Sequence, residues 1–219
     1  MINCSGLVVN LKRSGKMPEL SAVIVGVGEW KRYTKPLLDS MRIHNPDASV
    51  VCVDNGGQYP DYDGVAMVRT NKVVSYPEAL NAGLQVSNSS DWYLILNNDI
   101  LIEKPFGTED FDPGCLYGFI KYPFGQFEYL AGWAMFIPYE AIVSVGYFDE
   151  ALKPMWFEDA DYCIRAQWAG FGLVVLDRKE VGIRHYEDEN MGERKAFMNR
   201  NMTDRRKNRQ YVERKHGLA

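Results

Sequence analysis

The stretch Asp91-Trp92-Tyr93-Leu94-Ile95-Leu96-Asn97-Asn98-Asp99 constrains this chain more than any other. Residues 92–96 are apolar or aromatic, which is the length and composition of a strand buried on both faces of a sheet. The run ends abruptly in two amides and a carboxylate. In an open α/β sheet, ligands bind beyond the carboxyl ends of the strands, so we expect Asn97 and Asp99 beside a ligand. An Asn-rich turn formed for purely local reasons is the alternative for this stretch alone.

Other expected strands and helices alternate before this one, with strands at 21–27, 49–53 and 65–68 and helices at 36–41 and 75–86. This alternation predicts an α/β fold with a largely parallel sheet flanked by helices. The helix at 75–86 has the clearest start, because Ser75 and Glu78 have the spacing of a capping box. The chain has no internal repeat or low-complexity linker, so we expect one domain over 1–219, with its core at about 20–190.

The second half of the chain changes in character after Asp99. Residues 104–114 are rich in proline, glycine and acids and are expected to form a surface loop. Beyond this loop we expect strands at 116–122, 127–137, 171–176 and 181–185 and helices at 140–145 and 156–168.

Composition narrows the environment of the protein. The net charge of −4 gives no general attraction to nucleic acid, so no nucleic-acid partner is expected. No stretch approaches the ~20 apolar residues of a transmembrane helix, and the N-terminus lacks a signal-peptide pattern. The four cysteines form no CxxC pair and are expected to be free thiols in a reducing compartment. We therefore expect a cytoplasmic protein, which could carry further catalytic domains in a longer parent chain.

Positive charge is concentrated near the end of the chain. Residues 193–215 hold nine Lys or Arg against three Asp or Glu, a local charge of +6, so the remainder carries −10. We expect this segment to form a mostly exposed basic helix that faces an anionic acceptor, a membrane surface or a following domain. A solvated helix packed by its few apolar side chains is an equally good interpretation.

Three carboxylates, Glu158, Asp159 and Asp161, stand in the first turn of a predicted helix. Acids favour helix N-termini, which is the simplest interpretation. The aromatic residues before them indicate a partly dry pocket, where desolvation raises the pKa of a carboxylate towards that of a useful general base. Asp159 and Asp161 point about 200° apart on a helix, so both cannot face one pocket. Capping of the helix, or pairing with Arg165 four residues on, is a sufficient role for Asp161.

His185 ends an apolar strand and would become a metal ligand if that strand returns to the sheet end that holds Asp99. Lone histidines are more often structural than ligating, and His44 and His216 have no surroundings in the sequence that favour a role. A carboxylate at a rigid strand end supplies the oxygen ligand that a hard divalent cation requires.

An ordered set of motifs runs through these elements: Val25–Glu29, Val53-Asp54-Asn55-Gly56, Tyr76–Gly83, Leu96–Asp99, Leu130–Phe136, Gly146–Glu150, Glu158–Tyr162 with Arg165, Ala169–Phe171 and His185. Their order and spacing resemble the family-two glycosyltransferases of the GT-A fold, a Rossmann-like fold of nucleotide-diphospho-sugar transferases. The resemblance implies a metal-dependent inverting enzyme that moves a sugar from a nucleotide-diphosphate sugar to an acceptor hydroxyl.

The resemblance also implies the donor and metal sites. Asn97-Asn98-Asp99 is similar to the family's DxD motif, with Asp99 and His185 on Mn²⁺ or Mg²⁺ and Asn97 facing the ribose or the metal shell. Asn97 replaces the commoner Asp, a spelling that occurs in the family, including its rhamnosyltransferase-like members. Asp54 would hold the nucleobase beside the backbone near Val27. Asn81 and Asn98 are expected among the donor-binding residues.

The remaining implied roles concern the sugar and the acceptor. Asp159 matches the catalytic base and Glu158 its usual acidic neighbour, and Gly132 and Trp133 would line the sugar pocket. A uridine or thymidine diphosphate donor, carrying for example a hexose or rhamnose, is favoured because a pyrimidine offers an imide N–H to Asp54. The acceptor is expected to be a glycan or glycoconjugate.

Three other classes compete with this interpretation. A non-catalytic nucleotide-sugar- or glycan-binding module on the same fold is favoured by Asn97, which removes a charge from the metal motif. A dinucleotide-dependent oxidoreductase requires a third glycine where Lys31 stands. A sugar-nucleotide pyrophosphorylase requires a glycine-rich basic loop, which Gly28–Arg32 matches poorly.

Overall fold

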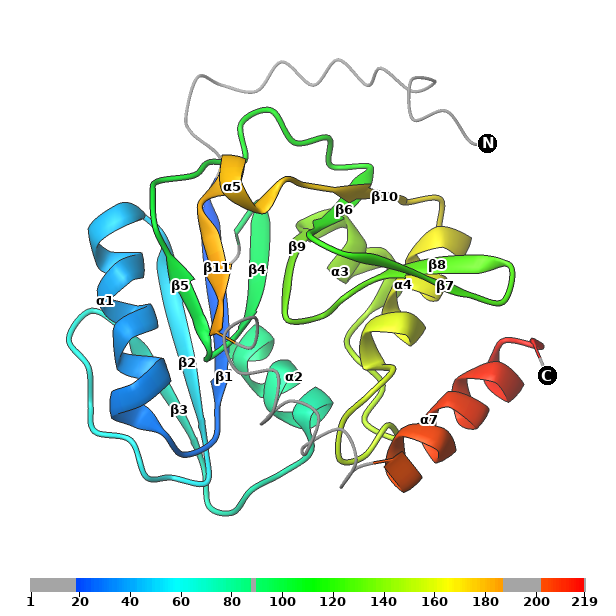
Figure 1. Cartoon of the computed structure of the whole chain (residues 1–219), viewed down its shortest axis with the longest axis horizontal. Coiled ribbons are helices and arrows are strands. Elements are labelled where there is room, and N and C mark those ends of the chain that lie inside the picture. Colours follow the sequence, from blue (N-terminus) through cyan, green and yellow to red (C-terminus); the bar gives the residue numbers. More distant parts are fainter. Residues whose placement is uncertain (1–18, 88–89, 187–201, 219) are drawn as a thin grey trace.

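A central sheet organises the computed structural model, which describes residues 19–87, 90–186 and 202–218. Within these residues the sheet has seven strands in the order β10-β6-β9-β4-β1-β2-β3 (Figure 1). Its strands are β1 (Leu20–Gly26), β2 (Ser49–Asn55), β3 (Ala66–Thr70), β4 (Trp92–Asn97), β6 (Cys115–Gly118), β9 (Ala134–Pro138) and β10 (Gly172–Val175). The pairings β1–β2, β2–β3, β1–β4 and β6–β10 are parallel, while β9 is antiparallel to both of its neighbours. The predicted α/β class with a mostly parallel sheet is confirmed.

Strand β4 lies between β1 and β9 in the middle of the sheet. Its five residues from Trp92 to Leu96 are all buried, as their composition predicts. Trp92, Leu94 and Leu96 point into one hydrophobic cluster, while Tyr93 and Ile95 point into the cluster on the other face. The strand is therefore rigidly held on both faces, which fixes the position of the polar residues that follow it.

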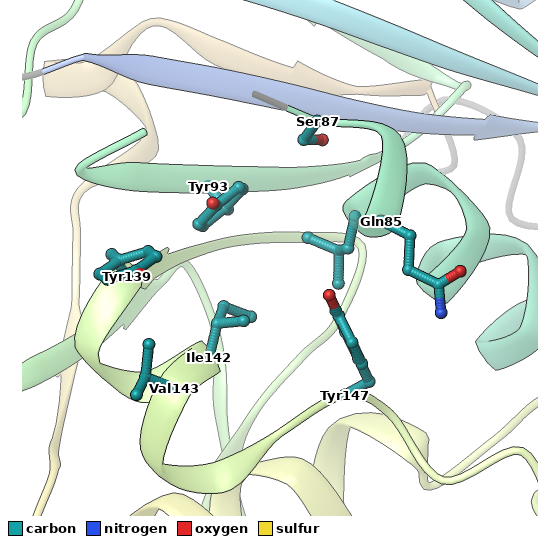
Figure 2. Close-up of a pocket in the computed structure, with 8 residues that line it drawn as sticks. Gln85, Ser87, Tyr93, Tyr139, Ile142, Val143 and Tyr147 are labelled. Atoms are coloured by element: carbon teal, nitrogen blue, oxygen red, sulfur yellow. The ribbon is translucent and has the colours of Figure 1, made fainter. Parts of the chain in front are cut away.

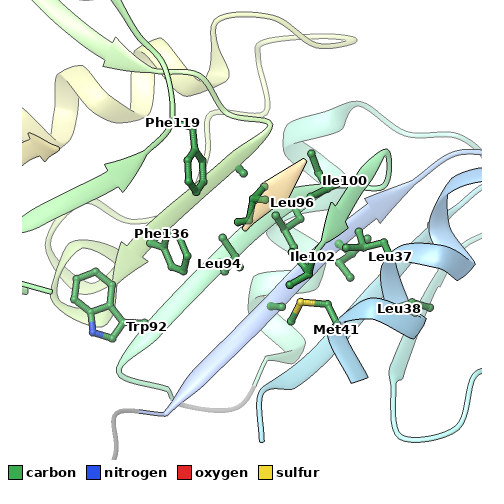
Figure 3. Close-up of a cluster of buried hydrophobic side chains, with 14 of the residues drawn as sticks. Leu37, Leu38, Met41, Trp92, Leu94, Leu96, Ile100, Ile102, Phe119 and Phe136 are labelled. Atoms are coloured by element: carbon green, nitrogen blue, oxygen red, sulfur yellow. The ribbon is translucent and has the colours of Figure 1, made fainter. Parts of the chain in front are cut away.

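Helices cover both faces of the sheet. The helical segments are a π-helical turn (Trp30–Thr34), α1 (Lys35–His44), α2 (Tyr76–Val86), α3 (Tyr139–Val145), α4 (Glu158–Trp168), α5 (Arg178–Val181) and α7 (Met202–Lys215). Leu37, Leu38 and Met41 of α1 pack on the face that carries Leu94 and Leu96 (Figure 3). Side chains of α2, α3 and α4 fill the cluster on the opposite face.

Helix α2 begins where the sequence predicts. The carboxylate of Glu78 accepts a hydrogen bond from the backbone N–H of Ser75, which is one half of the predicted capping box. The same helix lies very close to the sheet, since a Cβ atom on Gly83 would come within 2.4 Å of Cγ1 of Val23. Glycine at 83 therefore sets the distance between α2 and β1.

Two expected strands are each divided in the structure, which corrects the prediction. The stretch 116–122 separates into β6 and β7 (Lys121–Phe124), and 127–137 separates into β8 (Phe127–Leu130) and β9. Strands β7 and β8 pair in a hairpin outside the main sheet. The break before β9 falls at residues 131–133, because the N–H of Gly132 leaves the ladder and donates to a side chain of α4.

A second two-stranded sheet, formed by β5 (Ile100–Ile102) and β11 (Ile183–His185), brings residues 183–185 close to the end of β4. Strand β11 pairs antiparallel with β5, and His185 lies opposite Ile100. His185 therefore returns to the edge of the sheet that holds Asp99. The loop at 104–114 is mostly exposed, as expected, and it turns the half-buried Phe106 and Phe111 against Phe136 in the core.

Several sequence-based expectations concern the rest of the chain. Residues 1–18 and the part of the predicted basic helix at 193–201 lie outside the described residues, and α7 covers the remainder of that helix. Cys52, Cys115 and Cys163 are buried free thiols, as expected. Among the described helices, none combines the length and the apolar character needed to cross a lipid bilayer.

Candidate functional site

Asp99 and His185 face each other at the carboxyl edge of β4. Oδ2 of Asp99 lies 3.3 Å from Nε2 of His185, and the histidine is 5% exposed. Neither Oδ1 of Asp99 nor Nε2 of His185 has a hydrogen-bond partner among the described residues. Buried polar atoms normally have partners, so two such atoms at one point have the capacity to bind a ligand. An oxygen and an imidazole nitrogen together suit a divalent cation such as Mn²⁺ or Mg²⁺.

The indole of Trp133 orients the imidazole of His185. The two rings stack with centroids 4.8 Å apart and an angle of 6° between their planes. The carbonyl of Trp133 also accepts a hydrogen bond from the backbone N–H of Asn97, over 2.8 Å, at the end of β4. Trp133 thus connects the imidazole to the strand end that leads to Asp99, and it does so from the break between β8 and β9.

The metal ligands available from the protein are few. No third His, Cys, Asp or Glu joins Asp99 and His185 within the described part of the chain. A cation bound there would take its other ligands from water and from phosphate oxygens of a substrate, as Mg²⁺ commonly does. The residues therefore fit a metal that is completed by its substrate.

The two amides of the motif are anchored to neighbouring helices. Oδ1 of Asn97 accepts a hydrogen bond from the hydroxyl of Tyr76 over 2.7 Å, and Nδ2 of Asn98 donates to Oγ1 of Thr34 over 3.0 Å. These contacts hold the turn after β4 between α2 and the π-helical segment. Tyr76 was not singled out by the sequence analysis, because nothing in its local pattern shows which strand end its hydroxyl meets.

Asp159 lies at the second position of α4 and contacts the same break in the sheet. Its Oδ2 accepts a hydrogen bond from the N–H of Gly132 over 2.9 Å, and its Oδ1 accepts one from the N–H of Ala160 over 2.8 Å. Burial raises the pKa of Asp159 above the usual carboxyl range, and the two N–H donors partly oppose that rise. A buried carboxylate with a raised pKa has the properties of a general base.

Glu158 is the more deeply perturbed member of the pair. It is 8% exposed, and its Oε2 has no hydrogen-bond partner among the described residues. Burial first, and the charge of Asp159 second, raise the pKa of Glu158 well above its usual range. Glu158 is buried and Asp159 is partly buried, so the environment of Glu158 is the one of the two that favours the protonated carboxyl more strongly.

Tyr76 lies between the metal pair and the carboxylate pair. Burial raises its pKa most, followed by the charges of Glu158, Asp159 and Asp99 in that order. The two pairs also meet at residues 132 and 133, because the N–H of Gly132 donates to Asp159 and the indole of Trp133 stacks on His185. The structure therefore brings the predicted metal ligands and the predicted base into one site.

The turn before α4 has an unusual backbone. Trp156 and Phe157 both have positive φ angles, 85° and 67°. For residues other than glycine each such conformation costs on the order of 1–3 kcal/mol, and strain of this kind clusters at functional sites. The turn leads directly into Glu158 and Asp159.

Asp161 has a structural role. Its predicted pairing with Arg165 is confirmed, with Nε of Arg165 2.9 Å from Oδ2. Lys215 and His216 also reach it from the end of the chain, over 2.7 Å and 2.8 Å. His216, for which the sequence favours no ligand role, therefore has a structural contact, because α7 carries it to a buried carboxylate that is distant in the sequence.

Asp54 closes the loop that follows β2. Oδ1 accepts the N–H of Gln58 over 3.0 Å, and Oδ2 accepts the N–H of Tyr59 over 2.7 Å. The carboxylate is buried and also lies 3.8 Å from Nε of Arg69. In the register of the sheet Asp54 is paired with Gly26, so the exposed Val27 is adjacent to this loop. Val27 and Asp54 thus share one end of the sheet, as expected.

Asn81 does not have a free group for a donor, which corrects its expected role. Its Nδ2 donates to the carbonyl of Phe148 and to Oε1 of Glu150, each over 2.9 Å. Its Oδ1 accepts the N–H of Phe148 over 2.9 Å. Both amide hydrogens are used to attach α2 to the turn after α3, so Asn81 supports the fold.

A separate groove of about 330 Å³ lies between α2 and α3 (Figure 2). Its lining residues are Leu84, Gln85, Ser87, Tyr93, Tyr139, Ile142, Val143 and Tyr147. Tyr93 is the second residue of β4, whereas Asp99 follows the last, so the groove lies towards the other end of that strand. It includes none of the carboxylates or histidines described above.

The arrangement of strands and helices is shared with solved structures of one fold class. The chain has the GT-A fold of nucleotide-sugar-dependent glycosyltransferases. One similar solved structure is the mannosyltransferase PcManGT from Pyrobaculum calidifontis in complex with GDP-Man and Mn²⁺, with a TM-score of 0.56 and 14% identity. That match covers 74% of this chain and 56% of the mannosyltransferase.

Two further solved structures have the same fold. GalNAc-T7 with UDP, GalNAc and Mn²⁺ matches with a TM-score of 0.61 and 12% identity, over 74% of this chain and 43% of that one. S. aureus TarS 1–349 in complex with UDP matches with a TM-score of 0.54 and 14% identity, over 73% and 58%. This chain therefore spans less than two thirds of each. No protein-family model and no curated protein sequence matches it.

Proposed function

We propose that this protein is a metal-dependent inverting glycosyltransferase. It would transfer a sugar, for example a hexose or rhamnose, from a UDP- or dTDP-sugar to a hydroxyl of a glycan or glycoconjugate. One observation carries the proposal: the step from Gly132 to Trp133 contacts both halves of the site. The N–H of Gly132 donates to Asp159, and the indole of Trp133 stacks on His185.

The base is the part of the mechanism that this chain supplies most directly. The acceptor hydroxyl would lose its proton to Asp159 as its oxygen bonds to the anomeric carbon of the sugar. The bond from that carbon to the phosphate oxygen breaks, and a nucleoside diphosphate leaves. A divalent ion held by Asp99 and His185 would neutralise the negative charge that develops on this leaving group.

Inversion follows from the use of one displacement with one base. A base on the face of the sugar opposite the diphosphate suffices for a single attack, which inverts the anomeric centre. GT-A structures include retaining enzymes, so this assignment rests on Asp159 and not on the fold. Glu158 supports it, because its environment favours the protonated carboxyl more strongly, which favours Asp159 as the ionised group of the pair.

The donor would lie across the carboxyl edge of the sheet. Val27 and the loop closed by Asp54 supply the end that receives the nucleobase, and Asn97 and Asp99 face the ribose and diphosphate. Gly132 and Trp133 line the sugar position between the metal ligands and Asp159. The solved neighbours contain GDP-Man or UDP, and the preference for a pyrimidine here rests on Asp54.

A binding module without transferase activity is the second candidate. Asn97 favours it, because an amide replaces one acidic group of the metal motif and is already engaged by Tyr76. Such a module would bind a nucleotide sugar but would neither transfer nor hydrolyse it.

A screen of sugar nucleotides separates the two candidates. Wild-type protein would be incubated with UDP-, dTDP- and GDP-sugars, with Mn²⁺, Mg²⁺ or a chelator, and release of nucleoside diphosphate would be measured. The transferase proposal predicts metal-dependent release from a UDP- or dTDP-sugar, which is lost in Asp159→Asn. Tight calorimetric binding of a donor without any release, in the presence of a panel of glycan acceptors, would instead support the binding module.

A further inference from the structure

Helix α7 places a buried amide against the strained turn before α4. Asn208 is only 2% exposed. Its Nδ2 donates to the carbonyl of Met155 over 2.8 Å, and lies 3.2 Å and 3.3 Å from the carbonyls of Lys153 and Trp156. One side-chain amide from the end of the chain therefore binds three backbone oxygens that lie about fifty residues earlier.

Two of these carbonyls precede the residues with positive φ angles, and the third belongs to Trp156, the first of those residues. A turn that holds Trp156 and Phe157 in this conformation is strained and persists only when its surroundings fix it. The carbonyls of Met155 and Trp156 belong to partly buried residues, and a carbonyl shielded from water is destabilising when it has no donor. Asn208 removes that second cost only while the turn keeps its conformation, so its hydrogen bonds stabilise the strained state selectively.

Other contacts hold α7 against the body of the protein. Val212 packs in a buried cluster with Phe157 and residues of α4. Lys215 and His216 contact Asp161, as described above, and the guanidinium of Arg205 lies 5.6 Å from the ring centroid of Trp156. Docking of α7 therefore does not depend on Asn208, whose amide contacts the turn itself.

The turn has a second anchor at the metal side of the site. The backbone N–H of Tyr76 donates to the carbonyl of Pro154 over 2.7 Å, while its hydroxyl reaches Asn97. Asn208 thus closes the turn from one side and Tyr76 from the other. The last residue of the turn is followed at once by Glu158 and Asp159.

We propose that Asn208 is a positioning residue for the base. By binding the carbonyls of Lys153, Met155 and Trp156, it holds the turn in the conformation that places Asp159 against Gly132. The C-terminal helix is then part of the active-site structure rather than only a solvated basic segment. The catalytic consequence rests on the proposed function, whereas the effect on the turn does not.

The first experiment measures the turn directly, in the full chain. Hydrogen–deuterium exchange would be compared in wild type, Asn208→Ala and Gln210→Ala, the last a substitution of an exposed residue on the same helix. We expect faster exchange across residues 153–162 in Asn208→Ala, with unchanged exchange in β1 and β4, and wild-type exchange throughout in Gln210→Ala. Unchanged exchange at 153–162 in Asn208→Ala would overturn the proposal, whether or not the protein is an enzyme.

The second experiment tests the catalytic consequence with the donor found by screening. Asn208→Ala should lower kcat roughly 10- to 100-fold, since small displacements of a catalytic group have effects of that size, with the donor KM unchanged. The titratable groups that interact with Asp159 are Glu158 and Cys163 on its own helix, Tyr76 on α2, Tyr129 on β8 and Arg205 on α7, and this variant removes none of them. A shift of the acid limb of the kcat profile to lower pH would therefore report a more hydrated Asp159.

The results also separate this inference from the proposed function. A loosened turn with wild-type kcat and an unmoved acid limb would overturn the positioning role while leaving the transferase proposal intact. A loosened turn in a protein that releases no nucleoside diphosphate from any donor would count against the transferase and support the structural part alone. If Asn208→Ala lowers thermal stability, kcat is normalised to the folded fraction measured by far-ultraviolet circular dichroism.

Discussion

The backbone N–H of Gly132 donates a hydrogen bond to Oδ2 of Asp159 over 2.9 Å, and no side chain fits between these residues. A Cβ atom on Gly132 would lie 2.9 Å from Cβ of Asp159 and 3.4 Å from its Oδ2. The contact joins the break between β8 and β9 to the first turn of α4. It places a carboxylate with a raised pKa next to the residue that leads into Trp133.

Gly132→Ala should therefore displace Asp159. We expect kcat to fall by about 10- to 100-fold, because the new methyl group forces the base out of position. Calorimetric affinity for the nucleoside diphosphate with Mn²⁺ should stay at the wild-type value, since that ligand lacks the sugar. Gly114→Ala, in an exposed loop, is the control. Full activity in Gly132→Ala would show that the contact is dispensable.

Asp159→Asn should identify the base. Removal of a general base typically lowers the rate by ~10² to 10⁴, and we expect a loss of that size in turnover. Binding of the sugar nucleotide should persist, because Asp99 and His185 are unchanged. The comparison is with Glu158→Gln in the same assay. Transfer at a near wild-type rate by Asp159→Asn, together with an inactive Glu158→Gln, would mean that the two roles are exchanged.

Glu158 should make stability depend on pH in an identifiable direction. The pKa of Glu158 is raised in the folded protein, whereas the same carboxyl titrates near about pH 4 in the unfolded chain. Between that pH and neutrality the unfolded state therefore loses the proton while the folded state retains it. Ionisation therefore favours unfolding, and the contribution of Glu158 to stability declines as the pH rises through this window. The Tm of Glu158→Gln minus the Tm of wild type should increase from pH 4 to pH 8. A constant difference in Tm would contradict the burial of an uncharged Glu158.

The metal site should depend on its two ligands and on the ring that orients one of them. Asp99→Ala should abolish metal-dependent turnover, and His185→Ala should weaken binding of Mn²⁺ measured by calorimetry in the presence of the nucleoside diphosphate. Trp133→Leu keeps both ligands but removes the stacked ring, and we expect a loss of roughly 10- to 100-fold in metal affinity, as for other residues that orient ligands. His44→Ala, on α1, is the matched control and should bind as wild type does. Metal-dependent turnover that survives Asp99→Ala would refute the site.

Asp54 should determine the affinity for the nucleotide. In Asp54→Ala the N–H groups of Gln58 and Tyr59 lose their acceptor, so the loop beside Val27 loosens and the nucleobase loses its partner. We expect a lower calorimetric affinity for UDP or dTDP. Thermal melting without ligand measures the separate cost to the fold. Equal affinities of wild type and Asp54→Ala for UDP and dTDP would count heavily against the role.

Much of the fold could be predicted from local sequence. The apolar run at 92–96 specifies a strand buried on both faces, because hydrophobic burial acts on every residue of such a run. The spacing of Ser75 and Glu78 specifies the start of α2, because the carboxylate reaches back to a backbone N–H only three residues away. The pairing of Asp161 with Arg165 follows from one turn of helix in the same way.

Other features depended on contacts between distant segments. The apolar pattern of 127–137 is continuous, yet the strand breaks at Gly132, because its N–H finds a carboxylate on α4. The side-chain amide of Asn81 is hydrogen-bonded to the turn after α3, and the imidazole of His216 is hydrogen-bonded to Asp161. Each partner is more than fifty residues away in the sequence. A hydrogen bond of this kind forms only after both segments pack on the sheet, so no local pattern encodes it.

The sequence by itself therefore determined which side chains could act and which strand ends they follow. Asp99, His185 and Asp159 were identified from their types, their neighbours and an ordered resemblance. Only the tertiary structure decided that they share one region. The pairing of β5 with β11 places His185 beside Asp99, and Asn208 on α7 holds the turn that begins α4. Which residues become neighbours in a site depends on how helices and strands pack together, and the order of residues along the chain does not show that packing.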